Sequence, residues 1–174
     1  MKSLHAVLAL LLLATLVAIP FAARAEDDAL LRNQIISDHC ATLHSLIDQQ
    51  QRRDLVSRTN LGREYENTDK QLNAFTQRIH NNNIDAPQYQ QLLTQFRDAT
   101  SQFRDAYVHY DDAIVKLQAV NCQQRPSDFD AQLTVTRGLR DTTEGTITHA
   151  AALIGQYRDA VAQLALPNVK AATQ

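Results

Sequence analysis

The feature that most constrains the fold is a long stretch from Asp28 to His80 that contains no proline and only one glycine, Gly62. In its second half, apolar side chains recur at steps of three and four or their sum: Leu61, Tyr65, Leu72, Phe75 and Ile79. This spacing is typical of a helix that packs one stripe against other helices. A straight helix of this length would span about 75 Å. It cannot bury its own stripe, so the remainder of the chain must cover it.

Two breaks divide the rest of the chain. The first break covers Asn81 to Pro87, and the second covers Cys122 to Pro126. Because the apolar spacing resumes after each break, the sequence predicts helices over about 28–80, 87–121 and 127–165, with a flexible tail over 167–174. The expected fold is all-α: an elongated, coiled-coil-like antiparallel three-helix bundle over residues 26–166.

The first 25 residues have the pattern of a secretory signal peptide. Lys2 precedes an uncharged apolar run, which is followed by Pro20 and by the small residues Ala23 and Ala25. We predict cleavage after Ala25 and an extracytoplasmic protein, in the periplasm or at the cell surface. The alternative is that residues 4–23 are retained as a membrane anchor, since the run is just long enough to span a bilayer.

The two cysteines, Cys40 and Cys122, favour one disulfide in an exported protein, although a metal pair or two free thiols remain alternatives. If His80 lies near Pro87, facing residues of the first two helices have numbers that sum to about 167. Cys122 then faces about residue 45, which is little more than one turn from Cys40. The two thiols therefore meet at one end of the bundle, which supports the pairing.

A polar layer is expected about one third of the way from the disulfide end. It comprises Asp54, Arg58, Tyr107, Tyr110, Asp111 and Arg140, which the same register places at one height. One interpretation is a device that fixes helix register, because a misaligned packing would leave a charge alone. The other is a site for a small anionic ligand that uses Arg58 and Arg140.

Two further faces are candidates for contacts. The third helix carries a stripe of small and polar residues away from its apolar seam: Gly138, Thr142, Gly145, His149 and Ala152. Such a face either docks a second copy or a partner helix, or is simply solvated. The first helix begins early with Leu30, Leu31, Ile35 and Ile36, and an exposed apolar stripe of that kind usually marks a contact.

The sequence offers no catalytic site. Without Lys2 and Arg24, the mature chain has 15 basic and 19 acidic residues, a net charge of −4, which argues against binding nucleic acid. The motifs H-E-x-x-H, C-x-x-C, G-x-S-x-G and the glycine loops that bind phosphate are all missing. His39 and His44 could contribute to a metal site beside Cys40 only if its thiol were free. We therefore expect no enzyme activity, no cofactor and no metal.

A set of scattered residues forms a further pattern: Asp38-His39-Cys40, Arg58, Leu61 to Glu66, Asn121-Cys122, Pro126 and Phe129. This pattern resembles an uncharacterised family of exported bacterial helical proteins with two cysteines. The resemblance implies a bacterial extracytoplasmic protein with a coiled-coil body. It implies no activity, substrate or catalytic residue.

The function expected from the sequence is that of a non-enzymatic scaffold, which binds a protein partner, a second copy or a cell-envelope surface by its helical faces. The alternative is an extracytoplasmic sensor that binds a small ligand in the polar layer around Arg58 and Arg140.

Overall fold

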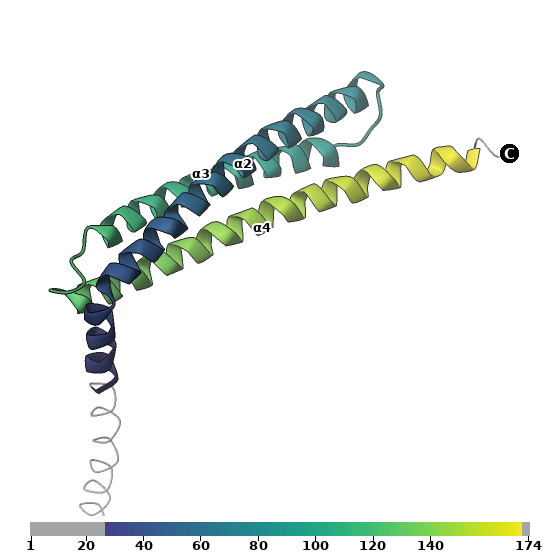
Figure 1. The fold of residues 1–174 in the computed structure, drawn as a ribbon. Helices are drawn as coiled ribbons and strands as arrows, with labels where there is room; N and C mark the ends of the chain where they lie inside the picture. The colour runs from purple at the N-terminus through teal and green to yellow at the C-terminus, as the bar shows by residue number, and fades with distance from the viewer. Residues whose placement is uncertain (1–26, 172–174) are drawn as a thin grey trace, which may run out of the picture.

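The computed structural model of the chain describes residues 27–171, with the side chains of residues 27–164. Four helices account for nearly all of this part: a segment over residues 27–38, then α2 (Cys40–Asn81), α3 (Gln88–Gln118) and α4 (Pro126–Ala171) (Figure 1). No strand occurs between residues 27 and 171. The predicted all-α class is therefore confirmed. The predicted signal peptide and its cleavage site lie outside the described residues.

The prediction of one continuous first helix is wrong. The helix is interrupted at His39, whose backbone (φ −104°, ψ 15°) departs from helical values, and the segment before it turns away from α2 (Figure 1). The segment before the bend contacts distant residues: Arg32 pairs with Asp130 at 3.1 Å, and the Ser37 hydroxyl donates to the Gln123 carbonyl at 3.3 Å. The prediction of three helices is thereby replaced by four.

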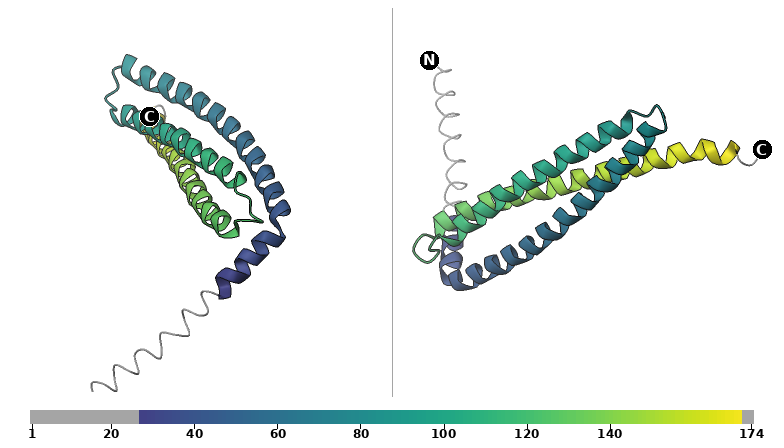
Figure 2. Two further views of the ribbon diagram at one scale, coloured as in Figure 1. Left: turned by 90° about the vertical axis from the view of Figure 1, so that its left-hand side faces the viewer. Right: turned by 90° about the horizontal axis from the view of Figure 1, so that it is seen from above.

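Helices α2, α3 and α4 run up, down and up, so that neighbours in sequence are antiparallel (Figure 1). Helix α3 packs along both neighbours, whereas no Cα atoms of α2 and α4 approach within 8 Å in the described chain. The buried alanines Ala99, Ala113 and Ala150 leave room for α3 and α4 to approach closely. Helix α2 instead bows away from this pair (Figure 2).

Two helix ends differ from those predicted. Helix α3 ends at Gln118 rather than near Asn121, because the Asn121 side chain accepts hydrogen bonds from the backbone N–H groups of Gln123 and Gln124 at 3.1 Å and shapes a turn. Helix α4 continues through Pro167 to Ala171, where a flexible tail from residue 167 was predicted.

The core divides into three clusters along the bundle. The largest lies toward the α2–α3 turn and is rich in aromatic edge contacts; its buried members include Tyr65, Leu72, Tyr89, Phe96, Phe103 and Tyr157. A smaller cluster surrounds the disulfide and contains Ile36, Cys40, Leu117, Cys122 and Phe129. Between them, Tyr107, Tyr110 and Ile114 form the third.

The predicted disulfide is confirmed. Cys40, the first residue of α2, is bonded to Cys122 in the α3–α4 turn, with Cα atoms 5.4 Å apart. Both residues are buried, Cys122 completely. The bond therefore fixes the start of α2 to the end of the bundle at which the segment of residues 27–38 leaves it.

Candidate functional site

The residues of the predicted polar layer come from three helices. Helix α2 supplies Asp54 and Arg58, α3 supplies Tyr107, Tyr110 and Asp111, and α4 supplies Arg140. All except Asp111 line one cleft of about 210 Å³ where α2 and α4 diverge. The Asp111 carboxylate lies outside this lining and accepts a hydrogen bond from Gln51 at 3.2 Å. Five of the six residues thus share a site.

Asp54 is held by neutral donors rather than by arginine. The Tyr110 hydroxyl donates to one of its oxygens at 2.6 Å, and the Gln50 amide donates to both at 2.8 and 2.9 Å. Hydrogen bonds to a charged acceptor are stronger than neutral ones. The bond between Asp54 and Tyr110 therefore ties α2 to α3 at the height of the cleft.

The two arginines of the cleft have different surroundings. The Arg58 guanidinium lies over the Tyr107 ring, 4.7 Å from its centroid. It has no carboxylate oxygen within 4.0 Å in the part of the chain whose side chains are described. Arg140 pairs with Glu144 at 3.3 Å, one turn further along α4, and both side chains are exposed. The cleft thus contains a cation that faces an aromatic ring instead of an acid.

Burial dominates the electrostatics of the two cleft tyrosines. It is the largest cause that raises the pKa of Tyr110, and the hydrogen bond to Asp54 and its charge add to the shift. Burial also raises the pKa of Tyr107, followed by the charges of Asp111 and Asp54, while Arg58 opposes the shift. Both hydroxyls stay protonated, so neither supplies an anion to the cleft near neutral pH.

The pKa is raised for all five tyrosines of the chain, which gives a prediction at alkaline pH. Burial is the first cause that raises the pKa of Tyr65, Tyr89, Tyr107, Tyr110 and Tyr157. A raised pKa in the folded state stabilises the fold fully below the unfolded value of about 10, and this contribution is lost as the pH rises toward the folded pKa. We expect tyrosinate absorbance to appear above pH 10 together with loss of the helical circular dichroism signal.

Each tyrosine that ionises only in the unfolded chain should steepen this loss by up to about 1.4 kcal/mol per pH unit. The chain has no tryptophan, so tyrosine absorbance reports without interference. The urea-unfolded chain is the control and should titrate near pH 10. Full ionisation at that pH with the helices intact would contradict the prediction.

The small-residue stripe of α4 lies on its outer surface. All five predicted members, Gly138, Thr142, Gly145, His149 and Ala152, are exposed. The Thr142 hydroxyl donates to the carbonyl of Gly138 at 2.9 Å, and a Cβ added at either glycine would meet no atom within 4 Å. The fold therefore does not itself require these glycines, and docking by this face stays a prediction.

Alanine at these two glycines should stabilise the chain. Gly138→Ala and Gly145→Ala should each raise the free energy of unfolding by about 1 kcal/mol, measured by urea unfolding, because alanine is the better helix former and the space is open. Gly62→Ala on α2, where the space for a Cβ is equally open, is the matched control for an effect on association. If the α4 face docks a second copy, only the α4 variants should also shift the sedimentation profile; a loss of stability would contradict the open geometry.

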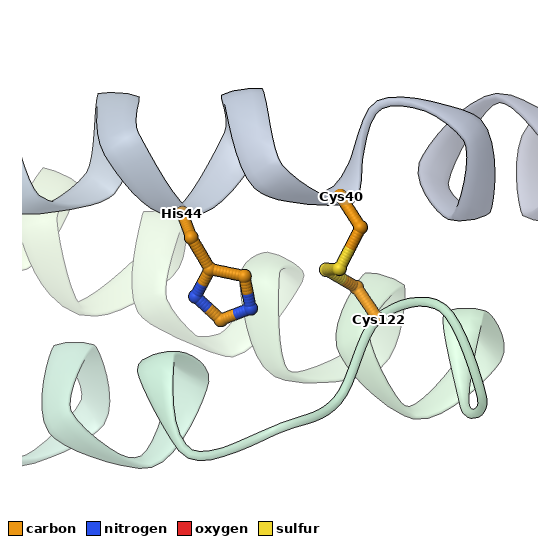
Figure 3. A group of neighbouring side chains, drawn as sticks. All are labelled: Cys40, His44 and Cys122. Carbon is orange, nitrogen blue, oxygen red and sulfur yellow. A yellow bond between two sulfur atoms is a disulfide. The ribbon is translucent and has the colours of Figure 1, made fainter.

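The sequence did not predict how His44 would lie. Cys40 and His44 are one turn apart on α2, and the imidazole extends beside the disulfide (Figure 3). The two cysteine sulfurs and a His44 nitrogen lie within 4.8 Å of one another. His39 was an equal candidate metal ligand on sequence grounds, but it is exposed at the helix break. The i, i+4 spacing was the one signal that distinguished the two histidines.

No protein-family model, curated protein or solved structure matches this chain. The resemblance to an exported two-cysteine family therefore stays a prediction. Among the helices that the structure describes, none combines the length and apolar character required to cross a bilayer.

Proposed function

We propose that the chain is an exported, non-enzymatic interaction protein of a bacterial cell envelope, which binds a protein partner through exposed helical faces. The observation that carries this proposal is the segment over residues 27–38. Leu30, Leu31 and Ile35 on this segment are 67%, 62% and 50% exposed. Large apolar side chains grouped in this way commonly mark a contact surface.

The segment over residues 27–38 is held against the bundle by several of its side chains. Ile36 is buried in the cluster around the disulfide, and Arg32 and Ser37 bond to Asp130 and Gln123. One face of the segment is thus fixed to the bundle, while Leu30, Leu31 and Ile35 remain exposed. This arrangement lowers the entropy that ordering the segment against a partner would otherwise cost.

Export is supported by the disulfide, which forms and persists in oxidising compartments. The signal-peptide pattern that precedes the described residues points the same way. Under this proposal the protein acts after cleavage following Ala25.

Site-specific photo-cross-linking in the native cells tests the proposal. A cross-linking residue at Leu31 should give a discrete adduct with a partner, whereas one at Asn60, exposed on α2, should not. The double substitution Leu30→Ser, Ile35→Ser should abolish the adduct without lowering the melting temperature, since both side chains are already exposed. Identical adducts from positions 31 and 60 would overturn the proposal.

The cleft around Arg58 favours a second candidate, a sensor that binds a small anion. The specific observation is that the Arg58 guanidinium lies over Tyr107 and has no carboxylate partner among residues 27–164. A ligand that binds only the folded chain at 100 times its Kd stabilises it by about 2.7 kcal/mol. Dicarboxylates and phosphate compounds should then raise the melting temperature of the wild type but not of Arg58→Gln. No gain from any of them would remove this candidate.

A further inference from the structure

The disulfide end of the bundle brings two sulfurs and one imidazole together. Cys40 and His44 project from one face of α2, and Cys122 approaches from the α3–α4 turn (Figure 3). One ligand atom from each residue lies within 4.8 Å of the other two. The His44 ring packs against Phe129 with centroids 5.8 Å apart, and within residues 27–164 neither ring nitrogen has a hydrogen-bond partner.

We propose that reduction of the disulfide converts this end of the bundle into a site for a thiophilic divalent cation of the Zn²⁺ class. The ligands are the Sγ atoms of Cys40 and Cys122 and one ring nitrogen of His44. Two thiolates and an imidazole are a usual ligand set for zinc.

The reductant in this step is a dithiol. The reductant gives two electrons to the Cys40–Cys122 bond and becomes a disulfide itself, and its two protons pass to the cysteine sulfurs. Binding of the cation then displaces these two protons, because only the thiolate is a strong metal ligand. The two sulfurs must separate to the roughly 3.8 Å that two thiolates on one tetrahedral zinc require.

The surroundings favour a divalent cation. Cys122 is fully buried and Cys40 is 8% exposed, within a cluster of apolar side chains. Two thiolates there would be costly alone, whereas with a doubly charged cation the group is neutral. An open hollow of about 360 Å³, lined in part by Cys40 and His44, gives solvent access. A reductant can enter there, and a water can occupy the fourth metal position.

Cobalt binding by the full mature chain tests the proposal. The chain is reduced with a phosphine, which takes the oxygen of one water molecule to become its oxide while the two protons of that water pass to the cysteine sulfurs. It is then titrated with Co²⁺ without oxygen. We expect one equivalent to bind with thiolate-to-cobalt charge-transfer bands and the visible bands of a tetrahedral ion, and Zn²⁺ to displace it. His44→Ala should weaken the affinity at least about tenfold. His80→Ala, at the exposed far end of α2, is the matched control and should bind as the wild type does.

If reduction loosens the fold, circular dichroism provides a second measurement of metal binding. Added Zn²⁺ should then restore the helical signal and melting temperature of the reduced wild type, and of His80→Ala, but not of His44→Ala. Equal affinity in His44→Ala and the wild type, absence of charge-transfer bands, or equal binding by the oxidised chain would each overturn the proposal.

Discussion

The double substitution Cys40→Ala, Cys122→Ala should lower the free energy of unfolding by about 4–5 kcal/mol. The disulfide joins residues separated by 82 positions, and closing a loop of that length removes this much chain entropy from the unfolded state. Urea unfolding of the variant and of the oxidised wild type, compared at one temperature, measures the difference. Few single features of a domain this size contribute as much.

The reduced wild type is the matched control, since it breaks the bond without changing a residue. It should unfold at nearly the same urea concentration as the double variant. Hydrogen exchange should quicken most in residues 27–39 and in the α3–α4 turn, which the bond holds together, and least around Phe96. A loss of stability below about 1 kcal/mol would show that the unfolded chain is already compact near these residues.

Tyr157→Ala should cost about 3–5 kcal/mol, the range for removing a large buried aromatic ring. Tyr157 is 4% exposed and contacts the rings of Phe75 and Tyr89 at centroid distances of 5.9 and 5.4 Å. Because the backbones of α2 and α4 stay apart, the contact with Phe75 on α2 holds α2 against α4, while the contact with Tyr89 joins α4 to α3. Thermal and urea unfolding, monitored by circular dichroism, measure the loss.

Tyr157→Phe separates the ring from the hydroxyl. The hydroxyl donates to the Leu72 carbonyl at 3.0 Å and lies 3.1 Å from the Thr76 Oγ1 atom. Phenylalanine keeps the ring contacts, so its cost should be about 1 kcal/mol. Equal losses in the two variants would mean that the hydrogen bonds, rather than the ring packing, attach α2 to α4.

The long-range organisation of the fold could be predicted because it follows from local signals. The step of three and four along the chain, with breaks at Asn81 to Pro87 and at Cys122 to Pro126, defines the helices near the positions observed. Antiparallel register then brings Cys40 close to Cys122, which the disulfide confirms. The same register gathered Asp54, Arg58 and Arg140 into one cleft.

The features that the sequence did not predict arise from contacts between distant residues. Nothing near His39 is a helix breaker; the contacts made at the bend join residues far apart in the chain, Arg32 with Asp130 and Ser37 with Gln123. The bow of α2 away from α3 and α4 is a feature of the three-dimensional packing, which periodicity along the chain does not encode (Figure 2). The placement of His44 beside the disulfide depends on where the α3–α4 turn carries Cys122.

The position of the sulfur bridge has a mechanical consequence. If the N-terminal segment is anchored and a load acts on the C-terminus, tension passes from Cys40 directly to Cys122 and onward into α4. Helices α2 and α3 lie inside the covalent loop and bear none of it. Without the bond, the chain between the two cysteines, which are 82 positions apart, could unfold under tension and extend to roughly 280 Å. With the bond intact it cannot extend, so the oxidised chain stays short under load.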